Sequence, residues 1–123
     1  KNEMFYAEKS NGSYLNNKRI RVSKRKNIDE CLFATNGKKF KDVKLHNRKS
    51  GSAALDMAYV ASGRYDGYFQ ENLNLWDIAA GLILVKEAGG ILNQVNLTKN
   101  ENLEIIASSS NINEKMLEKL GKF

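Results

Sequence analysis

The sequence predicts an α/β domain in which a mixed β-sheet is layered with flanking helices. Three observations lead to this fold class. Strand-like and helix-like segments alternate between residues 31 and 123, as they do in layered α/β proteins. Residues 78–88 form a nearly unbroken apolar run that is typical of a buried helix. The chain has 123 residues, of which 41% are hydrophobic, so it can bury one core.

An antiparallel meander is expected over residues 3–22. Residues 4–7 and 19–22 have the composition of strands. Asn11-Gly12 between them is a strong hairpin signal, and Asn16-Asn17 tolerates the positive φ angles that tight turns require.

A strand and a helix are expected next. Residues 31–35 are a short apolar run of the kind found in buried strands. Residues 52–62 predict a helix, because Ser52 can cap its start and Gly63 can end it.

A second strand and helix follow. Residues 68–70 predict the strand, and residues 72–75 connect it to the apolar run. That run predicts a helix over residues 78–88, closed by Gly89-Gly90. Because the helix is apolar nearly all round, we expect burial on more than one face.

Two strands and a helix complete the chain. Residues 91–95 and 103–107 predict the strands. Asn111 and Glu114 have the spacing of a capping box, which predicts a last helix that ends near Leu120.

The composition excludes several kinds of site. With one cysteine (Cys31) and one histidine (His46), the chain has no disulfide framework and no four-ligand zinc site. Any metal would be held mainly by oxygen, which favours magnesium, calcium or manganese. No apolar stretch has the length of a membrane span and nothing resembles a signal peptide, so we expect a cytoplasmic protein without a membrane partner.

Positive charge is concentrated in the first part of the chain. Residues 1–49 carry 14 Lys+Arg against 5 Asp+Glu, whereas residues 50–123 carry 6 against 9. One basic cluster could contact an RNA backbone weakly, with Tyr14 as a stacking surface. The favoured interpretation is a solvated hairpin edge on which charges prevent strand pairing. The cluster consists of Lys18, Arg19, Arg21, Lys24, Arg25 and Lys26.

Asp77 stands directly before the apolar run and has two interpretations. As an N-cap, its carboxylate would accept the free N–H groups at the helix start. As a metal ligand, it would be held rigidly at the edge of the sheet, facing any phosphate bound there. The two roles are compatible, because one oxygen can cap while the other binds a cation.

Four other side chains have simpler interpretations. We expect Asp56 to be a structural carboxylate within its helix and Asp66 to shape a turn before Gly67. Glu87 is unfavourable near a helix C-terminus, which predicts a salt-bridge partner. Trp76 is expected to anchor the core.

Several segments resemble the inositol monophosphatase family. WDIAAGLILVKEAGG, residues 76–90, is similar to the family's C-terminal signature. RKSGSAALDMAYVASGRYDGYFQ, residues 48–70, resembles the segment before it in bacterial members. Residues 2–23 resemble the hairpin that ends the family's first domain, and residues 105–120 match its last strand and helix.

The resemblance implies a fold and an activity. Family members are Mg²⁺-dependent phosphomonoesterases, in many cases inhibited by lithium, with layers in the order αβαβα and homodimeric assembly. It assigns magnesium binding to Asp77 and substrate contacts to Gly51, Ser52 and Ala53. Gln70 stands where an acidic residue commonly contacts inositol hydroxyls. The implied reaction is the hydrolysis of myo-inositol monophosphate, a small phosphorylated polyol, to inositol and phosphate.

The chain also departs from the family pattern. The D-P-x-D-G-T metal motif is absent, as are the upstream metal-binding glutamate and the threonine–aspartate pair that activates water. We therefore expect a fragment that retains no catalytic residue and is inactive without the N-terminal half. Residues 1–30 would be the closing hairpin of the first domain. Residues 31–123 would be the C-terminal domain, shortened at residues 36–47.

Two alternatives remain open from the sequence. The first keeps the family but changes the substrate to a sugar bisphosphate or a phosphorylated nucleotide, because Gln70 lacks the negative charge. The second is a non-catalytic RNA-associated module, because some bacterial relatives join transcription complexes.

Overall fold

The computed structural model describes residues 2–35, 45–48, 52–93 and 101–121. A five-stranded mixed sheet lies at its centre, in the order β5-β4-β6-β8-β7. β4 is parallel to β5 and β6, whereas β8 is antiparallel to β6 and β7. The strands are β4 (Phe33–Ala34), β5 (Asn47–Arg48), β6 (Gly67–Leu73), β7 (Ile91–Asn93) and β8 (Leu103–Ser108).

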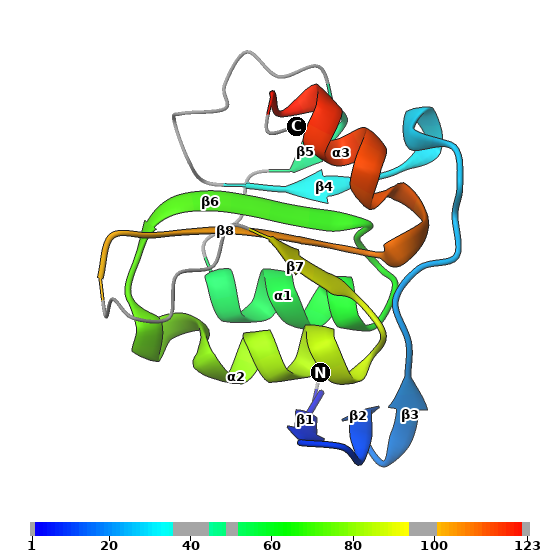
Figure 1. Ribbon diagram of the computed structural model, residues 1–123. Coiled ribbons are helices and arrows are strands. Elements are labelled where there is room, and N and C mark those ends of the chain that lie inside the picture. The colour runs from blue at the N-terminus through cyan, green and yellow to red at the C-terminus, as the bar shows by residue number, and fades with distance from the viewer. Residues whose placement is uncertain (1, 36–44, 49–51, 94–100, 122–123) are drawn as a thin grey trace.

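Helices cover both faces of this sheet (Figure 1). α1 (Ala53–Ala61) and α2 (Leu75–Glu87) pack on one face, in a core that includes Tyr68, Leu73 and Ile105. α3 (Asn113–Lys119) lies on the other face with the 3₁₀ turns η1 (Ile28–Glu30) and η2 (Ser110–Ile112). The core on that side contains Phe33, Phe69, Ile106, Ile112 and Met116.

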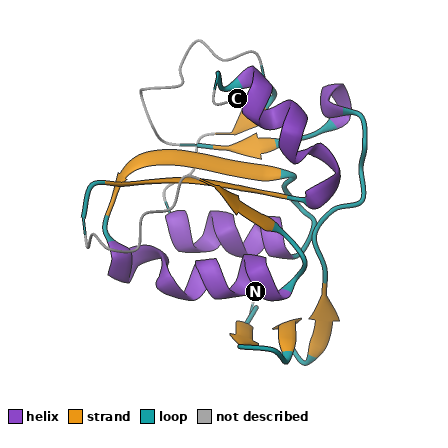
Figure 2. Cartoon of the chain, in the orientation of Figure 1, coloured by secondary structure: helices purple, strands orange, loops and turns teal. Residues whose placement is uncertain are grey.

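A smaller sheet packs on the outer side of α2. The meander expected over residues 3–22 is present as β1 (Phe5–Glu8), β2 (Gly12–Leu15) and β3 (Lys18–Ile20), all antiparallel. The Ser13 hydroxyl donates to the Leu84 carbonyl over 2.7 Å, which fixes the sheet to the helix. The order is therefore helix, sheet, helix pair, sheet (Figure 2), as expected for four of the five layers of the αβαβα fold.

α2 begins three residues before the predicted start, so Asp77 is not the N-cap. Asn74 occupies that position with extended backbone angles (φ −98°, ψ 144°). The Asp77 N–H donates to the Asn74 carbonyl over 3.1 Å, which places Asp77 inside the first turn. The N-cap interpretation was wrong because the helix begins earlier, at Leu75, although the Asn74 side chain itself makes no capping hydrogen bond.

α2 is also less enclosed than expected. Ile78, Gly81 and Leu82 face the core, but Trp76 is 70% exposed and Ile83 is 44% exposed. The prediction that Trp76 anchors the core was therefore wrong. The exposed side chains follow the helical spacing of one face, and the β1–β3 sheet covers the neighbouring positions near the other end of the helix.

β6 is longer than predicted and contains a bulge. Gln70 pairs with Ile105, but the next pair is Leu73 with Leu103, so β6 has one extra residue. Asn72 lies in the bulge with a φ of 58°, where a connecting loop was expected. The extra residue turns Leu73 back to the face that Tyr68 occupies, where both side chains are buried.

For the other two helices, the predicted ends of α1 were confirmed and the predicted start of α3 was wrong. Ser52 caps α1, with the Leu55 N–H donating to its hydroxyl over 3.2 Å, and Gly63 follows the helix with a φ of 82°. The capping box at Asn111 was wrong. Asn111 lies in η2, Ile112 is the N-cap of α3, and the Asn111 amide donates to the Lys24 carbonyl.

Some predictions concern residues outside the described part of the chain. These are Gly51, the greater part of the shortened segment, and the end of the strand expected over residues 91–95.

Candidate functional site

Four of the five predicted site residues line one cavity. It has a volume of about 450 Å³ and is lined by Ser52, Ala53, Ala54, Gln70, Asn72, Leu73 and Asp77. Gly51, the fifth, lies outside the described residues. Residues that are 25 positions apart in the sequence therefore meet at one hollow of the surface.

The arrangement of the elements explains this meeting. α1 and α2 begin side by side at the same edge of the molecule, next to the end of β6 (Figure 1). Both helix N-termini therefore lie at the cavity, represented by Ser52 and Asp77 in its lining. The unpaired N–H groups and the positive dipole end of each helix favour a bound anion, and phosphate is the common case.

Asp77 brings a carboxylate to this cavity. Its side chain is exposed, and none of the described residues donates a hydrogen bond to it. A carboxylate in the first turn of a helix is stabilised by the positive dipole end without a bond to the cap. Its oxygens therefore remain accessible to a cation in the cavity.

Gln70 is held by a tyrosine. The buried Tyr68 hydroxyl donates to Gln70 Oε1 over 2.8 Å. Burial raises the pKa of Tyr68, and the nearby Asp56 raises it further, so the phenol stays protonated and remains a donor. The bond holds the Gln70 side chain, which lines the cavity, against the sheet.

Sequence reasoning did not find Asn72. Its carboxamide lines the cavity because the bulge in β6 redirects the strand at this point. The available signal was an asparagine, which tolerates positive φ, following a strand pattern that loses its alternation. The bulge itself depends on pairing with Leu103, which lies 30 residues further along.

Comparison with known proteins shows to which family the chain belongs. The sequence model of the Inositol monophosphatase family matches residues 1–122. The chain belongs to the inositol monophosphatase family.

Two curated relatives and a solved structure illustrate the likeness within this family. The chain is 44% identical to a fructose-1,6-bisphosphatase/inositol-1-monophosphatase from Thermotoga maritima, over 74% of this chain and 39% of that protein. It is 38% identical to a Nus factor SuhB from Haemophilus influenzae, over 98% of this chain and 51% of that protein. An extragenic suppressor protein suhB from Bartonella henselae superposes with a TM-score of 0.84 at 35% identity, over 98% of this chain and 53% of that one. The chain spans about half the length of the curated relatives it matches.

The residues at the cavity fit one part of a magnesium site. Asp77 supplies the carboxylate oxygen that Mg²⁺ prefers, and Mg²⁺ commonly uses one or two carboxylates together with waters and substrate phosphate. Within residues 2–35, 45–48, 52–93 and 101–121, no group of three or more His, Cys, Asp and Glu could enclose a metal. A cation at Asp77 would therefore need phosphate oxygens or further ligands.

Asp66 does more than shape a turn. It is fully buried and accepts from Arg25 Nε over 2.9 Å and from the Leu32 N–H over 2.9 Å. Arg25 also donates to the Gly63 carbonyl over 2.8 Å. The Asp66 charge, after burial, is a cause of the raised pKa of the Cys31 thiol, about 11. Asp66 therefore connects the segment that follows β3 and the residue before β4 to the start of β6.

Glu87 has partners of a different kind from the one expected. Its two carboxylate oxygens accept from the backbone N–H groups of Ser10 (2.9 Å) and Gly12 (3.0 Å) in the β1–β2 turn. These bonds lower the pKa of Glu87. The carboxylate near the C-terminus of α2 thus fastens the small sheet to the helix, and no salt bridge is needed.

The basic cluster is only partly available for a ligand. Arg25 is engaged by Asp66, as described above. The other five side chains are exposed, so an RNA contact through them stays a prediction. They are Lys18, Arg19, Arg21, Lys24 and Lys26.

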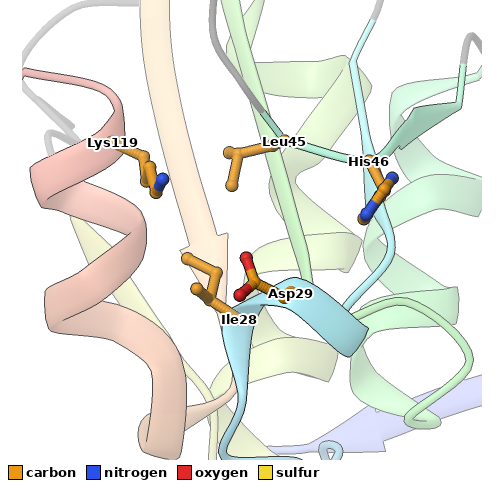
Figure 3. A pocket seen from close by; sticks show the side chains of 5 residues that line it. All are labelled: Ile28, Asp29, Leu45, His46 and Lys119. Atoms are coloured by element: carbon orange, nitrogen blue, oxygen red, sulfur yellow. The ribbon is translucent and has the colours of Figure 1, made fainter.

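A second hollow of about 270 Å³ lies near η1 and α3 (Figure 3). Its lining combines apolar side chains, Ile28 and Leu45, with Asp29, His46 and Lys119. None of these is a predicted site residue, and the hollow is bordered by elements different from those at Asp77.

In the described part of the chain, no helix has both the length and the apolar character to span a membrane.

Proposed function

We propose that this chain forms part of a magnesium-dependent phosphomonoesterase that hydrolyses myo-inositol monophosphate. The observation that carries the proposal is the cavity at which the accessible Asp77 carboxylate meets the N-termini of two helices. Family membership supports the reaction class.

Each element of the cavity has a task in this proposal. The N-terminus of α1, with Ser52 and Ala53, binds the phosphate dianion through N–H groups and the helix dipole. Asp77 holds Mg²⁺, and Gln70 contacts the polyol. When bound, Mg²⁺ neutralises charge on the ester and lowers the pKa of a coordinated water.

The proposal assigns this chain half of the active site. Because the matched relatives are about twice as long, we infer that the further metal ligands and the group that activates water belong to sequence outside the matched half. Residues 1–30 would then close a first domain, and residues 31–123 would form the second. Homodimeric assembly and a cytoplasmic location, expected for the family, are part of the same proposal.

A binding experiment tests the function on the chain itself. ¹⁵N-labelled chain is titrated with myo-inositol 1-phosphate in the presence and absence of Mg²⁺. We expect amide shifts centred on Ser52, Ala53 and Asp77, with an affinity that rises when Mg²⁺ is present. Asp77→Asn should remove the dependence on Mg²⁺, whereas Asp29→Asn, an exposed aspartate away from the cavity, should not. Shifts that avoid the cavity, or that ignore Asp77→Asn, would reject the proposal.

A second assay separates a complete site from half of one. The proposal predicts that the 123-residue chain alone releases no phosphate from this ester above the rate in buffer, because Asp77 is the one carboxylate that lines the described cavity. Magnesium-dependent release that is lost in Asp77→Asn would show that the half-site assignment is wrong.

A sugar bisphosphate is the alternative substrate. Gln70 is neutral, and the relative from Thermotoga maritima has both bisphosphatase and monophosphatase in its name. Profiling of phosphate esters by the same titration distinguishes the two substrates.

An RNA-associated role is the alternative outside enzymology. It is supported by the relative named Nus factor SuhB and by the five exposed basic side chains between Lys18 and Lys26. Backbone contacts would make RNA affinity fall steeply with salt concentration. Affinity that is independent of salt, or no affinity, would exclude this role.

A further inference from the structure

The second hollow, beside η1 and α3, shares no lining residue with the Asp77 cavity. It lies on the face of the central sheet that α3 covers, whereas α1 and α2 pack on the opposite face (Figure 1). Its volume of about 270 Å³ is just below the range of about 300–1,000 Å³ in which proteins bind drug-sized ligands. The hollow can therefore hold a small organic molecule, and the proposed phosphatase function gives it no task.

The floor of the hollow is apolar and fixed in place. Ile28 and Leu45 are half-buried and pack against the core that contains Phe33. The η1 turn is closed by a hydrogen bond from the Cys31 N–H to the Ile28 carbonyl over 3.2 Å. On the other wall, the His46 carbonyl accepts from the Phe33 N–H over 2.8 Å, which holds the residue after Leu45 beside β4. An aliphatic group of a ligand therefore meets a preformed apolar surface and displaces water from it.

The rim of the hollow carries opposite charges. Figure 3 shows the Lys119 amino group and the Asp29 carboxylate directed toward the space between the walls, with the His46 ring on the other side of Asp29. All three residues are exposed, and no described residue forms an ion pair or a hydrogen bond with their side chains. A cation and an anion that border one hollow without pairing can each bind a group of a ligand that lies between them.

These groups favour a ligand with both charges and an aliphatic body. A phosphate ester would be repelled by Asp29, and an amine without an anionic group would be repelled by Lys119. An uncharged apolar molecule would cover the floor, but it would shield both charged groups from water without giving either a partner. A zwitterion whose carboxylate accepts from Lys119 and whose ammonium donates to Asp29 avoids both costs. The His46 ring can hydrogen-bond with either end.

We propose that the second hollow binds a free α-amino acid with an aliphatic side chain, such as leucine. The side chain of the ligand lies on Ile28 and Leu45, its carboxylate meets Lys119 and its ammonium meets Asp29. Because the charged groups stay in contact with water, the dissociation constant should be on the order of 1 mM. This site does not depend on the proposed function, because it uses none of the residues at the Asp77 cavity.

The test titrates the ¹⁵N-labelled chain with L-leucine and with three analogues that each lack one group. Isocaproate lacks the ammonium, isoamylamine lacks the carboxylate and glycine lacks the side chain. We expect L-leucine to shift the backbone amides of Asp29, His46 and Lys119 and to leave those of Ser52 and Asp77 in place. Isocaproate and isoamylamine should bind about threefold to fivefold more weakly, the effect of one lost charge pair at an exposed site. Glycine should bind too weakly to measure, because it leaves the floor in water.

Two variants assign the charged contacts, and each has a matched control. Lys119→Met should abolish the preference for L-leucine over isoamylamine, and Asp29→Asn should abolish the preference over isocaproate. Glu30→Gln is at the next exposed position of η1, and Lys86→Met is at an exposed position in the last turn of α2. These controls make the same changes of charge outside the hollow and should leave both preferences unchanged.

The outcomes decide between the possible occupants. Equal affinity for isocaproate and L-leucine would show an apolar site without selection by charge, and the inference would be wrong. Preferences that persist in Lys119→Met and Asp29→Asn, or no shift of these amides up to the solubility limit of leucine, would reject it as well. All four substitutions replace exposed side chains, so each variant should stay folded, as its amide spectrum will show.

Discussion

Asp66 and Asp77 are aspartates eleven positions apart in the chain, and the structure uses them in opposite ways. Asp66 is fully buried and accepts from Arg25 and from the Leu32 N–H. Asp77 is exposed, and no described residue donates to its carboxylate. Buried polar groups are normally satisfied within the protein, so Asp66 is a structural residue. An accessible carboxylate beside two helix N-termini can instead bind a ligand from solution.

The two ends of α2 repeat this difference. Glu87 near the C-terminal end accepts two backbone N–H bonds from the β1–β2 turn and fixes the small sheet. At the N-terminal end, Trp76 and Asp77 are both exposed. One helix thus stabilises the fold at one end and forms the cavity at the other.

The largest expected effect is on stability, from Asp66→Ala. It leaves the Leu32 N–H without its acceptor and separates Arg25 from its partner, which should cost about 2–4 kcal/mol of unfolding free energy. The Arg25 side chain is 42% exposed and can turn to water, so the loss should stay below that of a fully buried pair. Urea unfolding measures the difference.

Asp77→Ala is the matched control for this experiment. Removal of an exposed carboxylate without donors should change the unfolding free energy by less than about 0.5 kcal/mol. Equal losses in the two variants would contradict the division of roles.

A smaller effect is expected from Glu87→Gln, and it depends on pH. The Ser10 and Gly12 N–H groups lower the pKa of Glu87 from its ordinary value of 4.5. The resulting stability is present above the unfolded pKa and is lost as the pH falls through the folded pKa. Wild-type chain should therefore exceed Glu87→Gln in stability near neutral pH, and the gap should close in acid. A constant gap down to about pH 3 would show that the bonds do not favour the charged form.

The smallest effect is expected from Trp76→Phe, within about 0.5 kcal/mol. Trp76 is the single tryptophan of the chain, so its fluorescence reports its exposure directly. Emission should resemble that of tryptophan in water, with ready quenching by iodide. A strongly blue-shifted, unquenched emission would mean that this face of α2 is covered.

Local signals in the sequence correctly predicted those elements whose ends are determined by nearby residues. The Ser52 cap, the Gly63 end of α1 and the meander with its Asn16-Asn17 turn all agree with the structure. These features are short-range, since a cap or turn is determined by side chains within a few residues.

The predictions that were wrong or incomplete concern residues whose structure depends on contacts far away in the sequence. The role of Asp66 depends on Arg25, 41 positions away, and the exposure of Trp76 depends on which neighbours cover α2. The bulge at Asn72 arises from pairing with β8. The resemblance to the family suggested which residues meet at the cavity, but it gave no reason to include Asn72.

The most direct measurement replaces Mg²⁺ with Mn²⁺, which accepts the same oxygen ligands and broadens nearby NMR signals through its paramagnetism. The chain is titrated with Mn²⁺ in the presence of myo-inositol 1-phosphate. We predict broadening centred on Asp77, Ser52 and Ala53 that disappears in Asp77→Asn and persists in Asp29→Asn. Broadening centred on another carboxylate, or retained in Asp77→Asn, would contradict the assignment of Asp77 as the metal ligand.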